Sequence, residues 1–231
     1  MQLKDISFPT PQENISFDEA LFQLADKKNN DEYLRFWESP VYFIVLGRIG
    51  KAEDDVDLAL AQADGVPVLR RTSGGGTVVQ GKGCLNYTLV LSKQNHPVLN
   101  DLHASYAWIS AKVIDALKPL GVEAAFRPFS DIALTASEKK FSGNAQHRGK
   151  THILHHGTIL YDFDLDLITR YLKMPKDTPV YRNSRKHKDF IANISIDHAQ
   201  FKSALARGFG MTDAPQPLTA QEIPTVKNYI K

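Results

Sequence analysis

The sequence predicts an α/β protein of the α+β type, with a mixed, largely antiparallel β-sheet flanked by helices. Three observations predict this fold class. Short apolar runs typical of strands follow one another along most of the chain, and helical segments interrupt them without the regular alternation of a doubly wound fold. No internal repeat, low-complexity tract or obvious linker divides the 231 residues, so residues 1–231 are predicted to form a single domain.

The first half of the chain begins with a helix signal. The capping-box pattern Ser16-Phe17-Asp18-Glu19 predicts a helix over residues 16–28. Strands are predicted at 33–37 and 41–46, separated by Ser39-Pro40. A short helix at 57–63 leads into the apolar run 66–69, and strand-like runs at 77–79 and 85–91 follow a glycine-rich stretch.

The second half contains the clearest amphipathic helix. Apolar side chains recur there at steps of three and four, at Tyr106, Ile109, Val113, Leu117 and Leu120. This spacing predicts a helix from near Leu102 that stops before Gly121. Strand signals at 122–126, 132–135, 140–146 and 152–161 then alternate with turns, and helices are predicted at 165–172 and 198–209.

Composition excludes several classes of protein. The formal net charge of +2 gives no argument for nucleic acid as a partner. A single cysteine excludes an intramolecular disulfide and fits a reducing compartment. The N-terminus has no secretory signal pattern, and no window approaches the ~20 apolar residues of a membrane span. We therefore expect a cytoplasmic protein that binds neither nucleic acid nor membrane.

The most informative segment is the run Arg70-Arg71-Thr72-Ser73-Gly74-Gly75-Gly76-Thr77-Val78-Val79. Glycines allow backbone N–H groups to approach a ligand, and arginines supply fixed positive charge, so the run suggests a site for an anion or an acyl phosphate. The alternative is a glycine-rich hairpin turn with two solvated arginines. Three glycines exceed what a two-residue hairpin needs, which favours a ligand contact.

A second segment, Lys139-Lys140-Phe141-Ser142-Gly143-Asn144-Ala145-Gln146, has strand character. Alternation along a strand would send Lys139 and Lys140 to opposite faces, so one of them can point inward. The small residues Ser142, Gly143 and Ala145 leave space around Lys140. A lysine ammonium suits a carboxylate or an α-phosphate oxygen, although a solvated lysine is the ordinary alternative.

Three further side chains have both a functional and a structural interpretation. Asp131 could hold Mg²⁺ that bridges nucleotide phosphates, or it could cap a turn. His156, in His155-His156-Gly157-Thr158, is more often a structural histidine than a base or ligand, and no zinc-ligand spacing is present. Cys84 could accept an acyl group, but a small buried apolar side chain is the commoner role.

Four positive charges occur within seven residues, at Arg182, Arg185, Lys186 and Lys188. A solvated loop explains them simply. The alternative is a contact surface for an acidic protein partner or for ATP phosphates.

The chain resembles the lipoate–protein ligases of the biotin/lipoate ligase superfamily. The resemblance rests on the order and spacing of the blocks 70–79, 83–86, 140–146 and 156–160, and also on Asp131 and Val45-Leu46-Gly47-Arg48. The resemblance covers the chain from the first helix to about Asn193. It implies activation of lipoate or octanoate by ATP to an acyl adenylate, and transfer of the acyl group to a lysine of a lipoyl-domain protein.

The resemblance also implies roles for individual residues. Lys140 would be the catalytic residue, contacting both the acyl carboxyl oxygen and the α-phosphate, and Asp131 would bind Mg²⁺. The implied ATP-binding residues are Arg71, Gly75, Gly76, Thr77, Val78, Val79 and Lys140. The implied substrate-binding residues are Arg70, Ser73, Gly74, Ser142, Gly143, His156, Gly157 and Thr158. An apolar tunnel beneath the glycine run would take the acyl chain, and residues 175–188 are a candidate lid.

The sequence departs from the family pattern at four places. Gln80-Gly81 stands where many ligases have His-Asp, Cys84 where asparagine is usual, and Ser130 where asparagine commonly precedes the aspartate. The chain also stops at Lys231 without the accessory C-terminal domain of larger members. We therefore expect that a separate accessory subunit could be needed for adenylation.

Three other functions remain open. An octanoyl or lipoyl transferase would act through a cysteine thioester, commonly from the segment matching residues 129–131, and here Cys84 is the only candidate. A biotin ligase would carry a Gly-Arg-Gly-Arg-type loop instead of the present run. A non-catalytic carrier-binding subunit would have little reason to keep Lys140 and the glycines.

Overall fold

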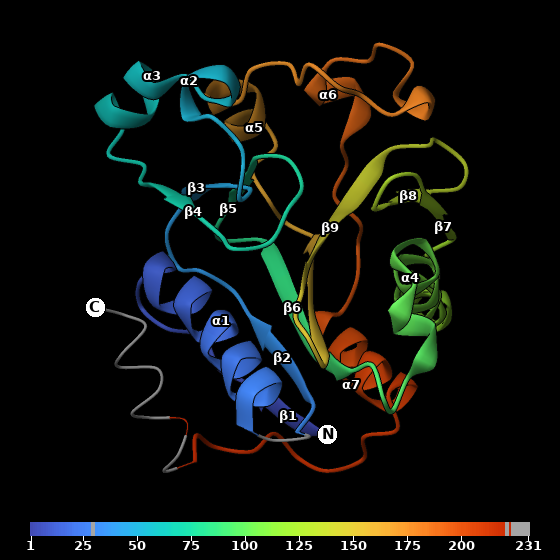
Figure 1. The fold of residues 1–231 in the computed structure, drawn as a ribbon. Helices are drawn as coiled ribbons and strands as arrows, with labels where there is room; N and C mark the ends of the chain where they lie inside the picture. The colour runs from blue at the N-terminus through green and yellow to red at the C-terminus, as the bar shows by residue number, and fades with distance from the viewer. Residues whose placement is uncertain (29–30, 220–221, 223–231) are drawn as a thin grey trace.

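The computed structural model describes residues 1–28, 31–219 and 222, and its main feature is a seven-stranded sheet (Figure 1). The strand order is β1-β2-β6-β10-β9-β8-β7, and every neighbouring pair is antiparallel except β1 and β2. The strands are β1 Gln2–Asp5, β2 Tyr33–Trp37, β6 Cys84–Ser92, β7 Ala124–Arg127, β8 Asp131–Leu134, β9 Lys140–Arg148 and β10 His152–Leu160. The predicted mixed, largely antiparallel sheet is therefore confirmed.

A second sheet of three strands has the order β4-β3-β5, with β3 parallel to β4 and antiparallel to β5. Its strands are β3 Phe43–Leu46, β4 Val68–Arg70 and β5 Val78–Gln80. The glycine-rich run is thus the connection between β4 and β5, at one end of this small sheet.

Helices cover both faces of the main sheet. One face packs against α4 Leu102–Leu117 and α7 His198–Gly208, and the other against α1 Pro11–Lys28. Above the small sheet in Figure 1 lie α2 Ala52–Asp55, α3 Leu58–Ala63 and α5 Asp166–Tyr171, while α6 His187–Phe190 lies at the upper right, above β9. The described residues also form 3-10 turns at η1 Pro97–Asn100, η2 Lys118–Leu120 and η3 Val180–Arg182.

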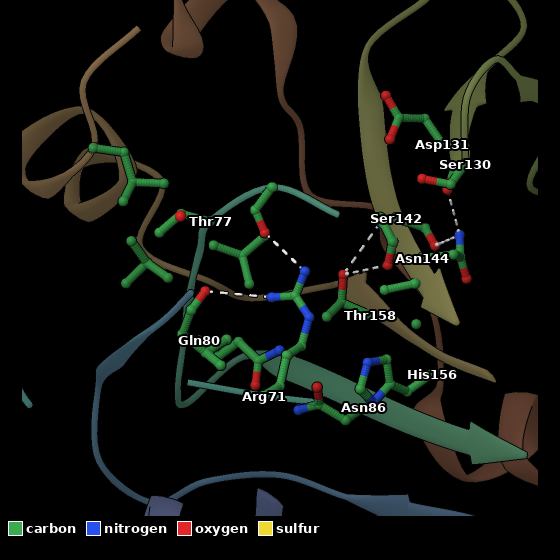
Figure 2. A pocket seen from close by; sticks show the side chains of 18 of the residues that line it. Arg71, Thr77, Gln80, Asn86, Ser130, Asp131, Ser142, Asn144, His156 and Thr158 are labelled. Atoms are coloured by element: carbon green, nitrogen blue, oxygen red, sulfur yellow. Dashed lines mark hydrogen bonds between the residues drawn. The ribbon is translucent and has the colours of Figure 1, made fainter. Parts of the chain in front are cut away.

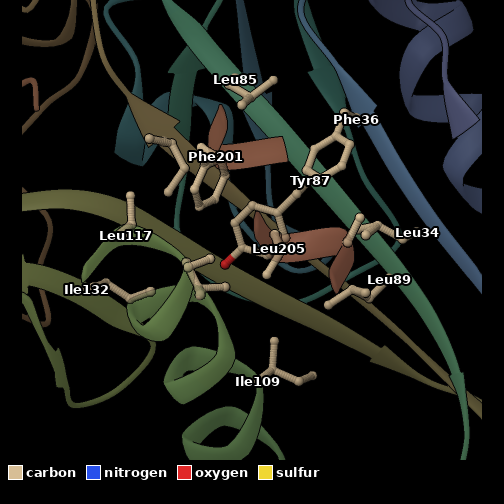
Figure 3. Close-up of a cluster of buried hydrophobic side chains, with 14 of the residues drawn as sticks. Leu34, Phe36, Leu85, Tyr87, Leu89, Ile109, Leu117, Ile132, Phe201 and Leu205 are labelled. Atoms are coloured by element: carbon tan, nitrogen blue, oxygen red, sulfur yellow. The ribbon is translucent and has the colours of Figure 1, made fainter. Parts of the chain in front are cut away.

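The largest core lies between the main sheet and the α4–α7 pair (Figure 3). Leu85, Tyr87 and Leu89 of β6 are fully or nearly fully buried there against Ile109 of α4 and Phe201 of α7. The apolar stripe predicted for residues 102–120 is confirmed, with α4 followed directly by η2 and ended by Gly121 at a left-handed φ of 80°. A smaller core joins the small sheet to α3 and α5.

The predicted start of the first helix is wrong. The helix begins at Pro11, because Thr10 and Glu13 form the capping box one turn and a half earlier than Ser16. Thr10 Oγ1 accepts from Glu13 N (3.2 Å), and Glu13 Oε2 accepts from Thr10 N (3.0 Å). Pro11 then fits the first helical position, where its missing N–H is not needed.

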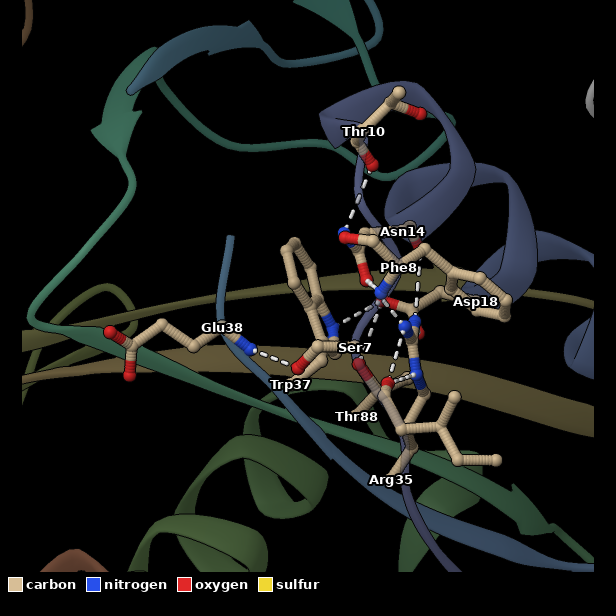
Figure 4. Close-up of polar contacts among 10 residues, drawn as sticks. Ser7, Phe8, Thr10, Asn14, Asp18, Arg35, Trp37, Glu38 and Thr88 are labelled. Atoms are coloured by element: carbon tan, nitrogen blue, oxygen red, sulfur yellow. Dashed lines mark hydrogen bonds and ion pairs between the residues drawn. The ribbon is translucent and has the colours of Figure 1, made fainter. Parts of the chain in front are cut away.

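A buried ion pair ties α1 to β2 (Figure 4). Arg35 Nη1 donates to Asp18 Oδ1 at 2.6 Å, and Asp18 Oδ2 also accepts from Trp37 Nε1 (3.2 Å) and Thr88 Oγ1 (2.8 Å). The two charged side chains are 0% and 4% exposed. This pair sets how α1 lies across the sheet.

The sequence analysis did not predict β1, α2 or α6. Strand β1 has four residues, and its Leu3 carbonyl accepts from the N–H of Gln216, more than 200 residues away. Such a strand depends on contacts distant in sequence, which a local pattern cannot indicate. The helices α2 and α6 each have four residues, too few for an apolar stripe.

Candidate active site

A cavity of about 560 Å³ lies between the main sheet and the small sheet (Figure 2). Its walls are the glycine loop, which we define as residues 70–77, with β5 on one side and β9 with β10 on the other. Side chains from the start of α1 and from residues 172–191 complete the lining. Segments far apart in the sequence therefore meet at one cavity.

Most of the residues that the sequence analysis selected line this cavity. They are Arg70, Arg71, Gly76, Thr77, Val78, Val79, Asp131, Lys140, Ser142, Gly143, His156, Gly157 and Thr158. Ser73, Gly74 and Gly75 belong to the same loop but are not among the lining residues. The structure thus brings the three sequence blocks together at one cavity.

The glycine loop is packed closely at one point and open at two. A Cβ on Gly47 would lie 2.0 Å from the carbonyl oxygen of Gly75, so this contact is main chain against main chain. Gly75 has a φ of +83°, which favours glycine. A Cβ on Gly74 or Gly76 would meet nothing within 4 Å, so their backbone has free space beside it.

Arg71 is buried and holds the loop together. Its Nη2 donates to the carbonyl oxygens of Gly74 (2.6 Å) and Gly76 (2.8 Å), and its Nε donates to Ser73 Oγ (3.0 Å). Burial lowers the pKa of the guanidinium to about 10, which leaves it charged at neutral pH. Arg71 therefore fixes the loop and brings a positive charge to the cavity wall.

Arg70 has a similar structural role, bonding the chain that follows β3. Its Nη1 donates to the carbonyl oxygens of Gly47 (2.8 Å), Arg48 (3.1 Å) and Gly50 (2.8 Å). Both arginines thus bind backbone carbonyls of the loop region. The sequence analysis interpreted them as ligand-binding or solvated side chains and missed this structural role.

His156 is a neutral partner of the glycine loop. Its Nε2 lies 2.6 Å from Ser73 Oγ, whose hydroxyl can donate because it already accepts from Arg71. Burial, followed by the positive charge of Arg71, holds the pKa of His156 well below its ordinary value. The histidine therefore joins β10 to the loop without adding a charge.

Lys140 and Asp131 form the main charged pair of the cavity. Lys140 Nζ lies 2.7 Å from Asp131 Oδ1, and Asp131 Oδ2 accepts from the Tyr181 hydroxyl at 2.7 Å. The lysine side chain bends back over its own strand, because a Cβ on Gly143 would lie 3.0 Å from Nζ. Burial and the carboxylate raise the pKa of Tyr181, so its hydroxyl remains a proton donor. Asp131 thus accepts from two sides.

Sequence reasoning missed two polar side chains of the cavity and one beside it. Tyr181, next to the basic segment, is not a lining residue but donates to Asp131. Asp55 lines the cavity and accepts from Thr77 Oγ1 at 2.6 Å, but nothing in its local sequence marks it. Trp37 lines the apolar part near Ile15, with its Nε1 held by Asp18. An apolar strand ending in tryptophan was the available signal for it.

The basic segment splits into buried and exposed members. Arg182 is 5% exposed and lines the cavity, and its guanidinium lies 4.6 Å from the Phe190 ring. Arg185 donates to the carbonyl oxygens of Ser137 and Glu138. Lys186 and Lys188 are exposed. The cluster therefore contributes one cation to the cavity and leaves two at the surface.

Cys84 has no access to the cavity. Its side chain is 0% exposed, it packs with Ile44 and Leu160 in the small-sheet core, and it is not among the lining residues. Burial raises the pKa of the thiol, which disfavours the thiolate. The sequence contains no other cysteine.

The described residues contain neither a cluster of metal-ligating side chains nor a membrane-spanning helix. Across residues 1–28, 31–219 and 222, no group of three or more His, Cys, Asp or Glu side chains is arranged to hold a metal ion. None of the helices in the described part of the chain is both long and apolar enough to cross a membrane.

Comparison with known families gives a match over most of the chain. The profile described as "Lipoyl protein ligase A/B catalytic domain" matches residues 10–210. Lipoate-protein ligase A subunit 1 of Thermoplasma acidophilum is 29% identical over 86% of this chain and 78% of its own length. Octanoyltransferase LipM of Carboxydothermus hydrogenoformans is 34% identical over 85% of this chain and 80% of its own length. Other ligase relatives are longer, and the chain spans 47% to 58% of them.

Solved structures share the fold. A bipartite lipoate protein ligase from Thermoplasma acidophilum, studied with its E2 lipoyl domain, has a TM-score of 0.84 at 24% identity, covering 99% of this chain and 91% of that one. A lipoate-protein ligase A with bound ATP also has a TM-score of 0.84 at 24% identity, covering 99% and 93%.

Proposed function

This chain belongs to the lipoyl protein ligase A/B catalytic domain family, and from that premise we propose that it is the ATP-dependent ligase of the two activities its relatives carry. It would join lipoate or octanoate to AMP and pass the acyl group to a lysine of a lipoyl-domain protein. One observation carries the proposal: the cavity contains a lysine–aspartate pair at 2.7 Å, while the sequence's single thiol is buried outside the lining.

In the first half-reaction a carboxylate oxygen of the fatty acid forms a bond to the α-phosphorus of ATP, and the bond to pyrophosphate breaks. Negative charge on the two meeting groups must be neutralised for this to happen, and Lys140 offers an ammonium that can leave Asp131 to do so. Arg71 and Arg182 add positive charge from opposite sides of the cavity. No nucleophilic side chain is required.

In the second half-reaction the acceptor lysine nitrogen bonds to the acyl carbonyl carbon, and AMP leaves. The incoming ammonium must first lose a proton. Asp131, once Lys140 has moved to the phosphate, is a carboxylate within the same cavity that can accept it. Tyr181 would continue to hold the other oxygen and keep the carboxylate in place.

The cavity offers different surroundings to the two proposed substrates, ATP and lipoate. The open backbone at Gly74 and Gly76 and the charged pair provide a polar region, and Ile15, Trp37 and Leu154 provide an apolar one in the same cavity. We propose that the acyl chain lies along the apolar region, beneath the glycine loop. Cleavage of the bond between the α-phosphate and pyrophosphate would supply the free energy to form the acyl–phosphate bond.

For Mg²⁺ the carboxylate assigned from the sequence is Asp131, whose oxygens bind Lys140 and Tyr181. Asp55 and Asp177 also line the cavity. Magnesium at nucleotide sites typically takes only one or two protein carboxylates. Asp131 therefore fits as a protein ligand beside the phosphate oxygens of ATP in the first half-reaction, where the metal would neutralise phosphate charge, before the carboxylate accepts a proton in the second.

We further propose that its partners are a lipoyl-domain acceptor and a separate accessory subunit. The support is that a ligase sharing this fold is bipartite and was studied with its E2 lipoyl domain. Residues 175–188 remain the proposed lid, since Pro175, Asp177, Pro179 and Arg182 already line the cavity. ATP with lipoate should protect this segment from protease, and unchanged cleavage would contradict the lid.

The test is ATP–pyrophosphate exchange by the purified protein with lipoate, octanoate or biotin. Exchange that depends on lipoate or octanoate and disappears in Lys140→Ala is expected. Cys84→Ala should retain more than about half of the activity, because removing one buried sulfur costs roughly 1 kcal/mol of stability and touches no lining residue.

The second candidate, an octanoyltransferase, is favoured by the 34% identity to a LipM protein. It predicts the opposite pattern: octanoyl transfer from an acyl carrier without ATP, abolished in Cys84→Ala. Activity that needs ATP and survives this substitution would exclude it. Dependence of exchange on biotin would instead indicate a biotin ligase.

A further inference from the structure

We propose that Asn144 is a positioning residue for the Asp131–Lys140 pair, holding the carboxylate that holds the lysine. The functional meaning of this inference rests on the proposed ligase activity. Its geometry does not, because it follows from one continuous set of hydrogen bonds between β6, β8, β9 and β10.

Asn144 fixes the chain immediately before Asp131. The carbonyl oxygen of Ser130 accepts from the backbone N–H of Asn144 (3.0 Å) and also from its side-chain Nδ2 (2.8 Å). Asp131 itself pairs with Gly143 in the β8–β9 ladder. Two donors on one carbonyl therefore set the direction in which the chain enters β8 at Asp131.

The other end of the Asn144 amide is fixed by two buried donors. Its Oδ1 accepts from the Tyr87 hydroxyl and from His155 Nε2 (3.2 Å). His155 Nδ1 lies 3.1 Å from Gln146 Nε2, which can only donate, so the proton of the neutral ring is on Nε2. Burial lowers the pKa of His155 to about 3, which keeps the ring in this state. The amide orientation is thus determined from both sides.

Two glycines leave space for this arrangement. A Cβ on Gly157 would lie 2.1 Å from Asn144 Oδ1 and 2.4 Å from the Tyr87 hydroxyl oxygen. A Cβ on Gly143 would lie 3.0 Å from Lys140 Nζ. The sequence analysis assigned Gly157 to substrate binding. The structure gives a second reason for glycine at this position, since a side chain there would overlap Asn144 and Tyr87.

The consequence reaches Lys140 through Asp131. The ammonium is held by Asp131 Oδ1, and the carboxylate's other oxygen is held by Tyr181 from the 172–191 segment. Asn144 lines the cavity, and its amide bonds Ser130, Ser142, Tyr87 and His155 but not Lys140. It therefore acts on the lysine through Asp131.

The experiment measures how fast acetic anhydride, at trace concentration, acetylates Lys140, with Lys139 as the internal reference in the same peptide. A lysine nitrogen that is no longer held by a carboxylate is more open to the reagent, so it reacts faster. Asn144→Ala should raise the Lys140 rate about fivefold relative to Lys139, which is the worth of about one hydrogen bond, and Tyr87→Phe should raise it by a smaller factor of about two.

The same measurement in a protein that carries Asp131→Ala shows whether Asn144 acts through Asp131. If it does, the double variant Asn144→Ala/Asp131→Ala should react no faster than Asp131→Ala alone. A purely structural role would multiply the two factors. Ser105→Ala is the matched control, since Ser105 bonds Gln146 in the same buried cluster but not Asn144, and should leave the rate unchanged.

Wild-type reactivity in both Asn144→Ala and Tyr87→Phe, or multiplying factors in the double variant, would overturn the inference. Tyr87→Phe, which removes one oxygen, keeps the test valid if Asn144→Ala fails to fold. The labelling needs no catalysis, so failure of the proposed function appears separately, as absence of exchange by the wild-type protein. Where exchange occurs, Asn144→Ala should lower kcat about tenfold with KM for ATP nearly unchanged.

Discussion

The buried pair between Asp18 and Arg35 leads to a stability prediction that can be worked from its contacts. Arg35 is fully buried and also donates to the Ile6 carbonyl (2.9 Å) and to Asn14 Oδ1 (2.7 Å). Removing the carboxylate in Asp18→Leu leaves a buried guanidinium without its counter-charge and leaves the donors of Trp37 and Thr88 without an acceptor.

Each single variant, Asp18→Leu or Arg35→Met, should lower the free energy of unfolding by about 3–5 kcal/mol, because breaking a buried pair strands the remaining charge. The double variant Asp18→Leu/Arg35→Met should be more stable than either single variant, since an apolar pair of similar volume has no charge to desolvate. The two substitutions are thus expected to couple by about 3 kcal/mol or more.

Urea denaturation followed by far-ultraviolet circular dichroism measures these differences, and it avoids fluorescence from Trp37, which touches Asp18. The exposed pair of Arg170 with Asp64 is the control, and Arg170→Gln should leave the midpoint unchanged. Single variants that each lose less than about 1 kcal/mol, or losses that simply add, would refute the reasoning.

Three further predictions follow from particular contacts. Gly157→Ala should destabilise the protein by about 1–3 kcal/mol through overlap with Asn144, whereas Gly76→Ala, with free space around it, should melt like the wild type in thermal denaturation; equal melting of both would contradict the overlap. His155 has a folded pKa of about 3, below its unfolded value, so its contribution to the free energy of unfolding is fully present above pH 6.5 and is lost as pH falls towards 3. His155→Gln should therefore reduce the pH dependence of the free energy of unfolding between pH 4 and 6.5. The same pH dependence in the variant and the wild type would argue against a buried neutral ring. Burial of Asp26 opposes ionisation, but three backbone N–H groups outweigh it and lower its pKa to about 2, so about 1 kcal/mol of stability, discounted for solvent, should be lost as pH falls from 4 towards 2. Asp26→Asn should remove that acid-side loss, and an unchanged curve would count against it.

Much of the fold could be predicted because its longer elements carry their own periodicity. The helix at 102–117 and the strands at 84–92 and 152–160 have apolar patterns that their burial confirms. The start of the first helix could not be chosen, because Thr10-x-x-Glu13 and Ser16-x-x-Glu19 are equally good capping patterns. Only the packing of α1 on the sheet decides between them.

The candidate site divides in the same way. The glycine loop could be found because three consecutive glycines exceed what a two-residue hairpin needs, and Lys140 because small residues follow it along a strand. Tyr181 and Asp55 could not, since each acquires its role from one hydrogen bond to a residue at least 22 positions away. The hydrogen bonds of Arg70 and Arg71 to backbone carbonyls could not be predicted either. A sequence shows that a cation is present but not which carbonyls surround it.

The contact between Gly47 and Gly75 bears on where the cavity could change in size. It joins main chain to main chain, and neither glycine is a lining residue, so no side chain can be shortened at either position. Ile15 and Leu154, by contrast, line the cavity with side chains that can be shortened. Under the proposed ligase activity, room for longer or bulkier acids would therefore come from smaller residues on the helix and main-sheet sides.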